Sequence, residues 1–124
     1  MTGDKTSDGS KKQKSGKSNK SGKPDGSNIF WGNIFSTKYD LVVAICDDDI
    51  IEKRIGSNPR IKVSKSFYGG KLMDEQLALR IMKRATIGNL IGNRIVDVAE
   101  RGGFITRENV ILIGGVPHAQ FVKT

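Results

Sequence analysis

The chain has 124 residues, and its 21 lysines and arginines outnumber its 13 aspartates and glutamates, which gives a net charge of +8. Its single cysteine excludes an intrachain disulfide, and no apolar run approaches the roughly 18 residues of a membrane-spanning helix. Residues 1–28 also lack the apolar centre of a secretory signal. The length favours one domain, and we expect a soluble, cytoplasmic, basic protein.

Residues 1–28 are poor in apolar side chains and rich in positive charge. They contain seven lysines, six serines and five glycines, and their three aspartates leave a net charge of +4. Such a segment buries too little apolar surface to offset the entropy that is lost on ordering. We therefore predict a disordered Lys/Gly/Ser-rich tail, which is able to follow a phosphate backbone.

Phe30, Trp31 and Phe35 place three of the chain's eight aromatic residues within a short stretch. We expect residues 29–38 to form an aromatic connector, followed by a single domain over residues 39–124. The three rings could stack on unpaired bases or dock into a groove of a protein partner. Packing against the domain's own sheet is the more common role of aromatic side chains and is favoured.

A nearly continuous apolar run over 39–46 predicts a central strand that is covered on both faces. Asp47, Asp48 and Asp49 follow this run, and any of them could cap a short helix. Consecutive side chains point in different directions, so capping explains the triplet better than a Mg²⁺ site does. Residues 60–64 alternate between polar and apolar, which predicts a half-buried strand.

Two adjacent helices are predicted next. Asp74 is a typical N-cap, and the acidic start and basic end of residues 75–84 complement a helix dipole. Apolar residues then recur at three- to four-residue spacing over 85–101, which predicts a second helix directly after the first. Gly88 and Gly92 would let another backbone approach this helix closely.

Residues 110–113 and 119–122 are predicted to form a final pair of strands around a turn over 114–117. The predicted order is therefore β-β-α-α-β-β. This grouping is typical of an α+β fold with a small, mainly antiparallel sheet and two consecutive helices.

Four segments resemble those of an archaeal family of uncharacterised proteins, the domain of unknown function 424. They are YDLVVAICD at 39–47, FYGG at 67–70, RATIGNLIG at 84–92 and IGGVPHAQ at 113–120. The resemblance covers about residues 39–122 and implies an archaeal cytoplasmic protein with a small α+β fold. It also implies a loose association with RNA binding and translation, but no established activity.

Two glycine pairs, Gly69-Gly70 and Gly114-Gly115, could present backbone N–H groups to a phosphate, with Lys71 and His118 as neighbours. Neither pair has the spacing of a nucleotide-binding loop, and a tight turn is the more frequent use of such a pair. His118 is the only histidine, which favours a structural over a catalytic role.

Cys46 ends the most apolar run, and we expect a buried, unreactive thiol there. One cysteine and one histidine cannot complete a zinc site. We predict no metal site, no cofactor and no catalytic residue.

These features favour a non-enzymatic RNA-associated protein, most concretely an archaeal ribosome- or translation-associated factor. Ribosomal RNA is its expected partner, with ribosomal proteins as further candidates and no membrane partner. The residues expected to contact RNA phosphates are Lys5, Lys11, Lys12, Lys14, Lys17, Lys20, Lys23, Arg60, Lys62, Lys65, Lys71, Lys83 and Arg84. Two alternatives stay open. One is a small enzyme or phosphate-ligand-binding module that uses the Gly-Gly loops and His118; the other is a protein–protein adaptor that docks through Phe30, Trp31 and Phe35.

Overall fold

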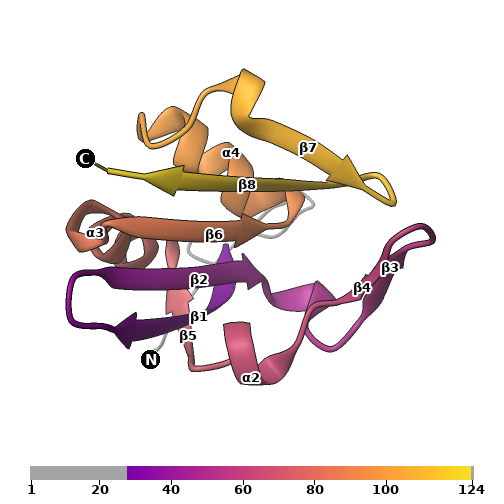
Figure 1. The fold of residues 1–124 in the computed structure, drawn as a ribbon, viewed down its shortest axis with the longest axis horizontal. Coiled ribbons are helices and arrows are strands. Elements are labelled where there is room, and N and C mark those ends of the chain that lie inside the picture. Colours follow the sequence, from indigo (N-terminus) through magenta and orange to yellow (C-terminus); the bar gives the residue numbers. More distant parts are fainter. Residues whose placement is uncertain (1–27, 124) are drawn as a thin grey trace, which may run out of the picture.

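A six-stranded sheet forms the centre of the computed structural model, which describes residues 28–123 (Figure 1). The strand order is β5-β1-β2-β6-β8-β7. The strands are β1 (Ile29–Ser36), β2 (Leu41–Asp47), β5 (Lys71–Asp74), β6 (Ile87–Ile91), β7 (Val110–Ile113) and β8 (Val116–Val122). β2 and β6 are parallel, whereas the other neighbouring strands are antiparallel. The predicted α+β class with a largely antiparallel sheet is therefore confirmed.

A separate hairpin pairs β3 (Arg54–Gly56) with β4 (Arg60–Lys62). The helices are α2 (Lys65–Tyr68), α3 (Glu75–Arg84) and α4 (Asn93–Arg101), and short 3-10 turns span Asp48–Ile50 and Arg107–Asn109. α3 and α4 pack on one face of the sheet, while α2 and the hairpin contribute to a smaller apolar cluster on the other (Figure 1). Within the described residues, no helix has the length and apolar character to cross a membrane.

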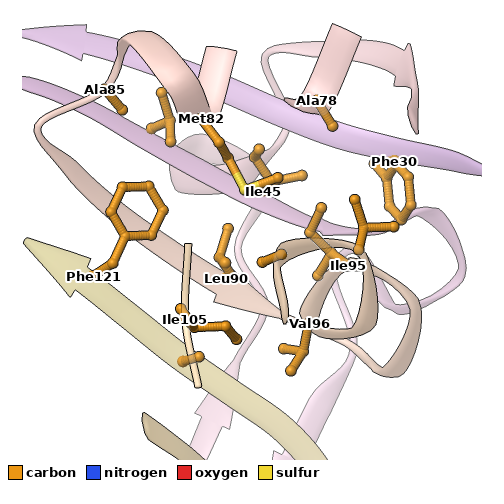
Figure 2. Packing of buried hydrophobic residues seen from close by; sticks show 14 of the residues in the cluster. Phe30, Ile45, Ala78, Met82, Ala85, Leu90, Ile95, Val96, Ile105 and Phe121 are labelled. Atoms are coloured by element: carbon orange, nitrogen blue, oxygen red, sulfur yellow. The ribbon is translucent and has the colours of Figure 1, made fainter. Parts of the chain in front are cut away.

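Side-chain alternation along the strands builds two apolar clusters. Phe30, Val43 and Ile45 point toward α3 and α4, where they join the larger cluster (Figure 2). Ala44 and Cys46, from the same central strand, point to the opposite face. β2 is therefore covered on both sides, as its continuous apolar run predicts.

Two further sequence predictions are confirmed. The Asp74 side chain accepts a hydrogen bond of 2.9 Å from the backbone N–H of Leu77 and caps α3. The final strand pair is β7 and β8, which are joined by Gly114 and Gly115 with φ of +58° and +80°. Two positive φ values at a two-residue turn are typical of the type I′ hairpin, for which glycine is well suited.

The predicted helix over 85–101 is wrong in its first half, because residues 87–91 form strand β6. β6 lies between β2 and β8 and is hydrogen-bonded on both sides. A Cβ at Gly88 would lie 2.1 Å from the Phe121 ring, so the glycine makes room for an aromatic side chain and not, as predicted, for another backbone. Gly92 lies between the end of β6 and the first residue of α4. Its φ of +128° is a backbone conformation that favours glycine. Strand pairing thus overrides a helical apolar spacing, and the predicted β-β-α-α-β-β order is wrong.

The segment predicted as a connector, residues 29–38, contains β1, which pairs with both β2 and β5. Phe30 is fully buried in the core. Asn28 also contacts the domain, because its side chain donates to Glu75 and accepts from Arg94. The folded unit therefore includes residues 28–38, although this segment contains no long apolar run.

Asp47 caps α4, which is distant in sequence, rather than the 3-10 turn that follows it. This buried carboxylate accepts hydrogen bonds of 2.9 and 2.8 Å from the backbone N–H groups of Arg94 and Ile95. Burial raises the pKa of Asp47, while those two N–H groups and the Arg94 charge act in the opposite direction. A Cβ at Gly92 would lie 2.4 Å from the Asp47 carboxyl carbon, so glycine is required for this approach.

Replacing Asp47 tests this contact. Asp47→Ala leaves two N–H groups without acceptors in a buried site, so the free energy of unfolding should fall by about 2 to 4 kcal/mol. Asp47→Asn keeps one acceptor and should cost about half as much. Urea denaturation of the full chain measures both values. Equal losses for the two variants would contradict the assigned capping role.

Candidate functional site

The β3–β4 hairpin presents a cluster of basic side chains on its outer face. Arg54 lies directly opposite Lys62 in the register, and Arg60 lies opposite Gly56. All three cationic side chains are exposed. Because side chains alternate along a strand, Ile55 and Ile61 point the other way and pack against the smaller apolar cluster. Lys53 and Lys65 flank the two strands, and we call residues 52–65 the basic hairpin.

The excess positive charge of the described domain is concentrated in this segment. The basic hairpin contains five basic side chains and one acidic side chain, a net charge of +4, while the other described residues contain nine of each sign. Several arginines elsewhere are paired: Arg94 with the aspartates at 47–49, Arg101 with Asp97 and Arg107 with Glu100. Lys53, Arg54 and Arg60 form no ion pair within residues 28–123.

Glu52 holds the base of the hairpin together. Its side chain lies 3.2 Å from Lys62 Nζ and accepts a 2.7 Å hydrogen bond from the Lys65 N–H. That hydrogen bond, and then Lys62, lower the pKa of Glu52 below its usual value, so the residue is a carboxylate at neutral pH. Its own backbone N–H donates to the Val63 carbonyl at 2.6 Å, which extends the strand ladder toward α2.

A polar cluster fixes the segment that follows the hairpin. The Tyr68 hydroxyl donates to Asn89 Oδ1 at 2.6 Å, and His118 Nε2 lies 3.2 Å from the same oxygen. An amide oxygen only accepts, so the contact is a hydrogen bond in the His118 tautomer that carries its proton on Nε2. Burial raises the pKa of Tyr68 and lowers that of His118. The cluster therefore anchors α2 to β6 and β8 with neutral groups.

Cys46 lies buried beside this cluster on the same face of the sheet. Burial, together with the neighbouring Asp47 charge, raises the pKa of its thiol to about 12. The thiol is protonated at neutral pH, which fits an unreactive group. Among residues 28–123, no three His, Cys, Asp or Glu side chains are placed to hold a metal ion.

The structure brings together only some of the basic residues that the sequence analysis proposed. Arg60, Lys62 and Lys65 belong to the basic hairpin. Lys53 and Arg54 complete it but were missed, although a count of charge over 52–65 could have found them. The tail lysines, Lys5 to Lys23, lie outside the described residues.

The remaining proposed residues lie elsewhere in the domain. Lys71 begins the edge strand β5. Lys83 and Arg84 end α3, and the next residues return to the start of β2, where the Thr86 N–H donates to the Leu41 carbonyl at 2.8 Å. The basic hairpin follows the other end of β2, so these two cations lie at the opposite end of the sheet (Figure 1).

The two glycine pairs do not meet. Gly70 packs against β1, where an added Cβ would lie 2.6 Å from the Gly32 carbonyl oxygen. Gly114 packs against Gly56 of the basic hairpin, at the far edge of the sheet. Strands β1, β2 and β6 lie between β5, which Lys71 begins, and β8, which holds His118, so these two residues are not neighbours.

The aromatic residues of β1 are part of the sheet. Phe30 points into the helix-covered core and is not accessible for stacking or docking. Trp31 and Phe35 point to the other face and are partly buried there, with the Phe35 ring stacked on Phe67 at a centroid distance of 5.6 Å. All three rings thus pack within the domain, and only Phe30 is fully buried.

His118 gives a pH test because it is the only histidine in the chain. Its pKa is lowered in the native state, so near pH 6 the unfolded chain binds more protons than the native chain does. The free energy of unfolding should therefore fall as the pH drops below about 6.5, by no more than about 1.4 kcal/mol per pH unit. Urea denaturation between pH 7.5 and 5.5 measures this slope. His118→Gln should remove part of it, and an unchanged slope would exclude His118 as its source.

The sequence matches the family model described as "Protein of unknown function (DUF424)" over residues 35–124. Among solved structures, the fold is similar to that of an uncharacterized conserved protein from Methanopyrus kandleri. The two sequences are 24% identical and superpose with a TM-score of 0.67 over 77% of this chain and 94% of that chain. No curated protein matches the chain. The family match spans most of the chain, which therefore belongs to the DUF424 family.

Proposed function

We propose that this protein binds RNA through the basic hairpin and the lysine-rich tail, and that ribosomal RNA is its target. The observation that carries the proposal is the concentration of the domain's net charge in residues 52–65. An exposed two-stranded ribbon with several cations on one face follows a phosphate backbone well. The proposed activity is association with ribosomes during translation, without catalysis.

The placement of like charges on the hairpin supports this function. Arg54 and Lys62 are directly opposed across the two strands, and like charges in such a pair destabilise a sheet. Glu52 offsets one of the cations, but Arg54 and Arg60 form no ion pair within the described domain. A polyanion on the outer face would relieve this repulsion. A charge arrangement that disfavours the free hairpin is thus explained by an anionic partner.

The tail extends the proposed footprint. Its seven lysines precede β1, and they would add a salt-sensitive contribution that does not depend on RNA sequence. Asn28 contacts both Glu75 and Arg94, so a deletion of residues 2–27 removes the lysines without disturbing these contacts. The hairpin and the tail can therefore be tested separately.

Neutralising the hairpin should weaken RNA binding. In the triple variant Arg54→Gln/Arg60→Gln/Lys62→Gln, affinity for a ribosomal RNA fragment at low salt should fall roughly tenfold. The slope of log affinity against log salt should become about two to three units shallower, because each of three lost phosphate contacts contributes roughly 0.7 to 0.9. Fluorescence anisotropy of the full chain at several salt concentrations measures both quantities. Thermal stability should change little, because relief of the Arg54–Lys62 repulsion offsets the loss of the exposed Glu52–Lys62 ion pair.

A matched control carries the same change of charge at another place. Arg80, Lys83 and Arg84 are exposed on α3. Lys83 and Arg84 were expected to contact RNA, but they lie at the opposite end of the sheet from the basic hairpin and outside the surface proposed here. Arg80→Gln/Lys83→Gln/Arg84→Gln should therefore retain the affinity and nearly the full slope. Co-sedimentation with ribosomal subunits should follow the same order of variants. Equal losses for the two triple variants would mean that net charge alone matters, and no binding at low salt would contradict the proposal.

A further inference from the structure

The tip of the basic hairpin lies against the turn between β7 and β8 (Figure 1). A Cβ on Gly114, in the β7–β8 turn, would lie 2.4 Å from the backbone nitrogen of Gly56. Gly56 itself has φ +80°, and a Cβ there would lie 2.5 Å from the Pro59 carbonyl oxygen. The approach of the two turns therefore requires glycine at 114, while the positive φ and the Pro59 carbonyl of the same hairpin require glycine at 56.

A pocket of about 360 Å³ lies between the two tips. We call this cavity the tip pocket. It is lined by Gly56, Ser57, Asn58, Pro59, Leu112, Ile113 and Gly114. Pro59, Leu112 and Ile113 supply apolar surface. Ser57 and Asn58 are exposed, and neither side chain forms a hydrogen bond within the described domain. The tip pocket therefore combines apolar walls with polar groups that are open to a ligand.

Leu112, like its neighbour Ile111, is an exposed apolar side chain. It is 68% exposed and lies on β7, the edge strand of the sheet. An exposed apolar side chain on an edge strand is available for contact, and Leu112 also lines the tip pocket. Arg60 follows Pro59 directly in the chain, is exposed and forms no ion pair within the described domain. The ligand should therefore have an apolar face and a nearby anionic group.

We infer that the tip pocket receives one unpaired base of a single-stranded RNA whose phosphates lie along the basic hairpin. This inference rests on the proposed function and makes it more specific. A nucleobase has flat apolar faces for Leu112 and Pro59, polar edges for Ser57 and Asn58, and a phosphate within reach of Arg60. A base in a duplex is stacked and paired, so only an unpaired base could enter.

Two probes of equal charge separate a base contact from a phosphate contact. One is a fluorescently labelled ten-nucleotide oligouridine, and the other is a ten-unit abasic oligomer with the same number of phosphates. The full chain should bind the oligouridine more tightly than the abasic oligomer. Leu112→Ser should lower the affinity for oligouridine by about fivefold to tenfold, which is the scale of one lost base contact. It should leave the affinity for the abasic oligomer unchanged.

Ile111→Ser is the matched control. Ile111 adjoins Leu112 on β7 and is 57% exposed, but it does not line the tip pocket. This variant should bind both probes as the unmodified chain does. Equal affinity of the unmodified chain for the two probes, or equal losses for the two variants, would overturn the base site and leave the phosphate-binding proposal intact. Failure of both probes to bind at low salt would overturn the proposed function and this inference together.

Discussion

The contact between the Asp47 carboxylate and the first turn of α4 connects the main parts of the domain. Asp47 ends the central strand β2 and accepts hydrogen bonds from two backbone N–H groups of α4. A carboxylate at this position satisfies N–H groups that have no partner within the helix and lies at the positive end of the helix dipole. Arg94, in the same turn, extends the network to the Ile29 carbonyl and to Asp48. The start of β1, the end of β2 and the start of α4 are thereby held at one point.

This network also sets where the basic hairpin begins. Asp48 and Asp49 form the 3-10 turn that leads from β2 to β3, and both carboxylates lie within ion-pair distance of Arg94, at 2.6 and 3.5 Å. On its other side, the hairpin leads into α2, which the Tyr68–Asn89 hydrogen bond ties to β6. Both ends of the basic hairpin are therefore fixed to the sheet, while its outer face is open. A rigid base with exposed cations is what a surface for a long anionic partner requires.

The sequence was most informative where local chemistry decides the structure. The Asp74 cap, the continuous apolar run of β2 and the glycine turn between β7 and β8 depend on residues close together in the chain, and all three are found. Local sequence patterns predicted the wrong structure where pairing between distant strands determines it. Residues 87–91 have a helical apolar spacing, but backbone hydrogen bonds to β2 and β8 hold them as a strand of the sheet.

The site was predictable only in part, for a related reason. Arg60 and Lys62 could be placed on one face of a strand, but their approach to Arg54 depends on the register of a short hairpin. The meeting of Gly56 with Gly114 depends on two turns that are far apart in sequence. No pattern within either turn indicates that contact. Ultraviolet cross-linking of the full chain to a ribosomal RNA fragment, with mass spectrometry of the adducts, tests the account most directly. We predict adducts within residues 53–65 and 112–114 of the domain, and adducts confined to the α3–α4 face would contradict the account.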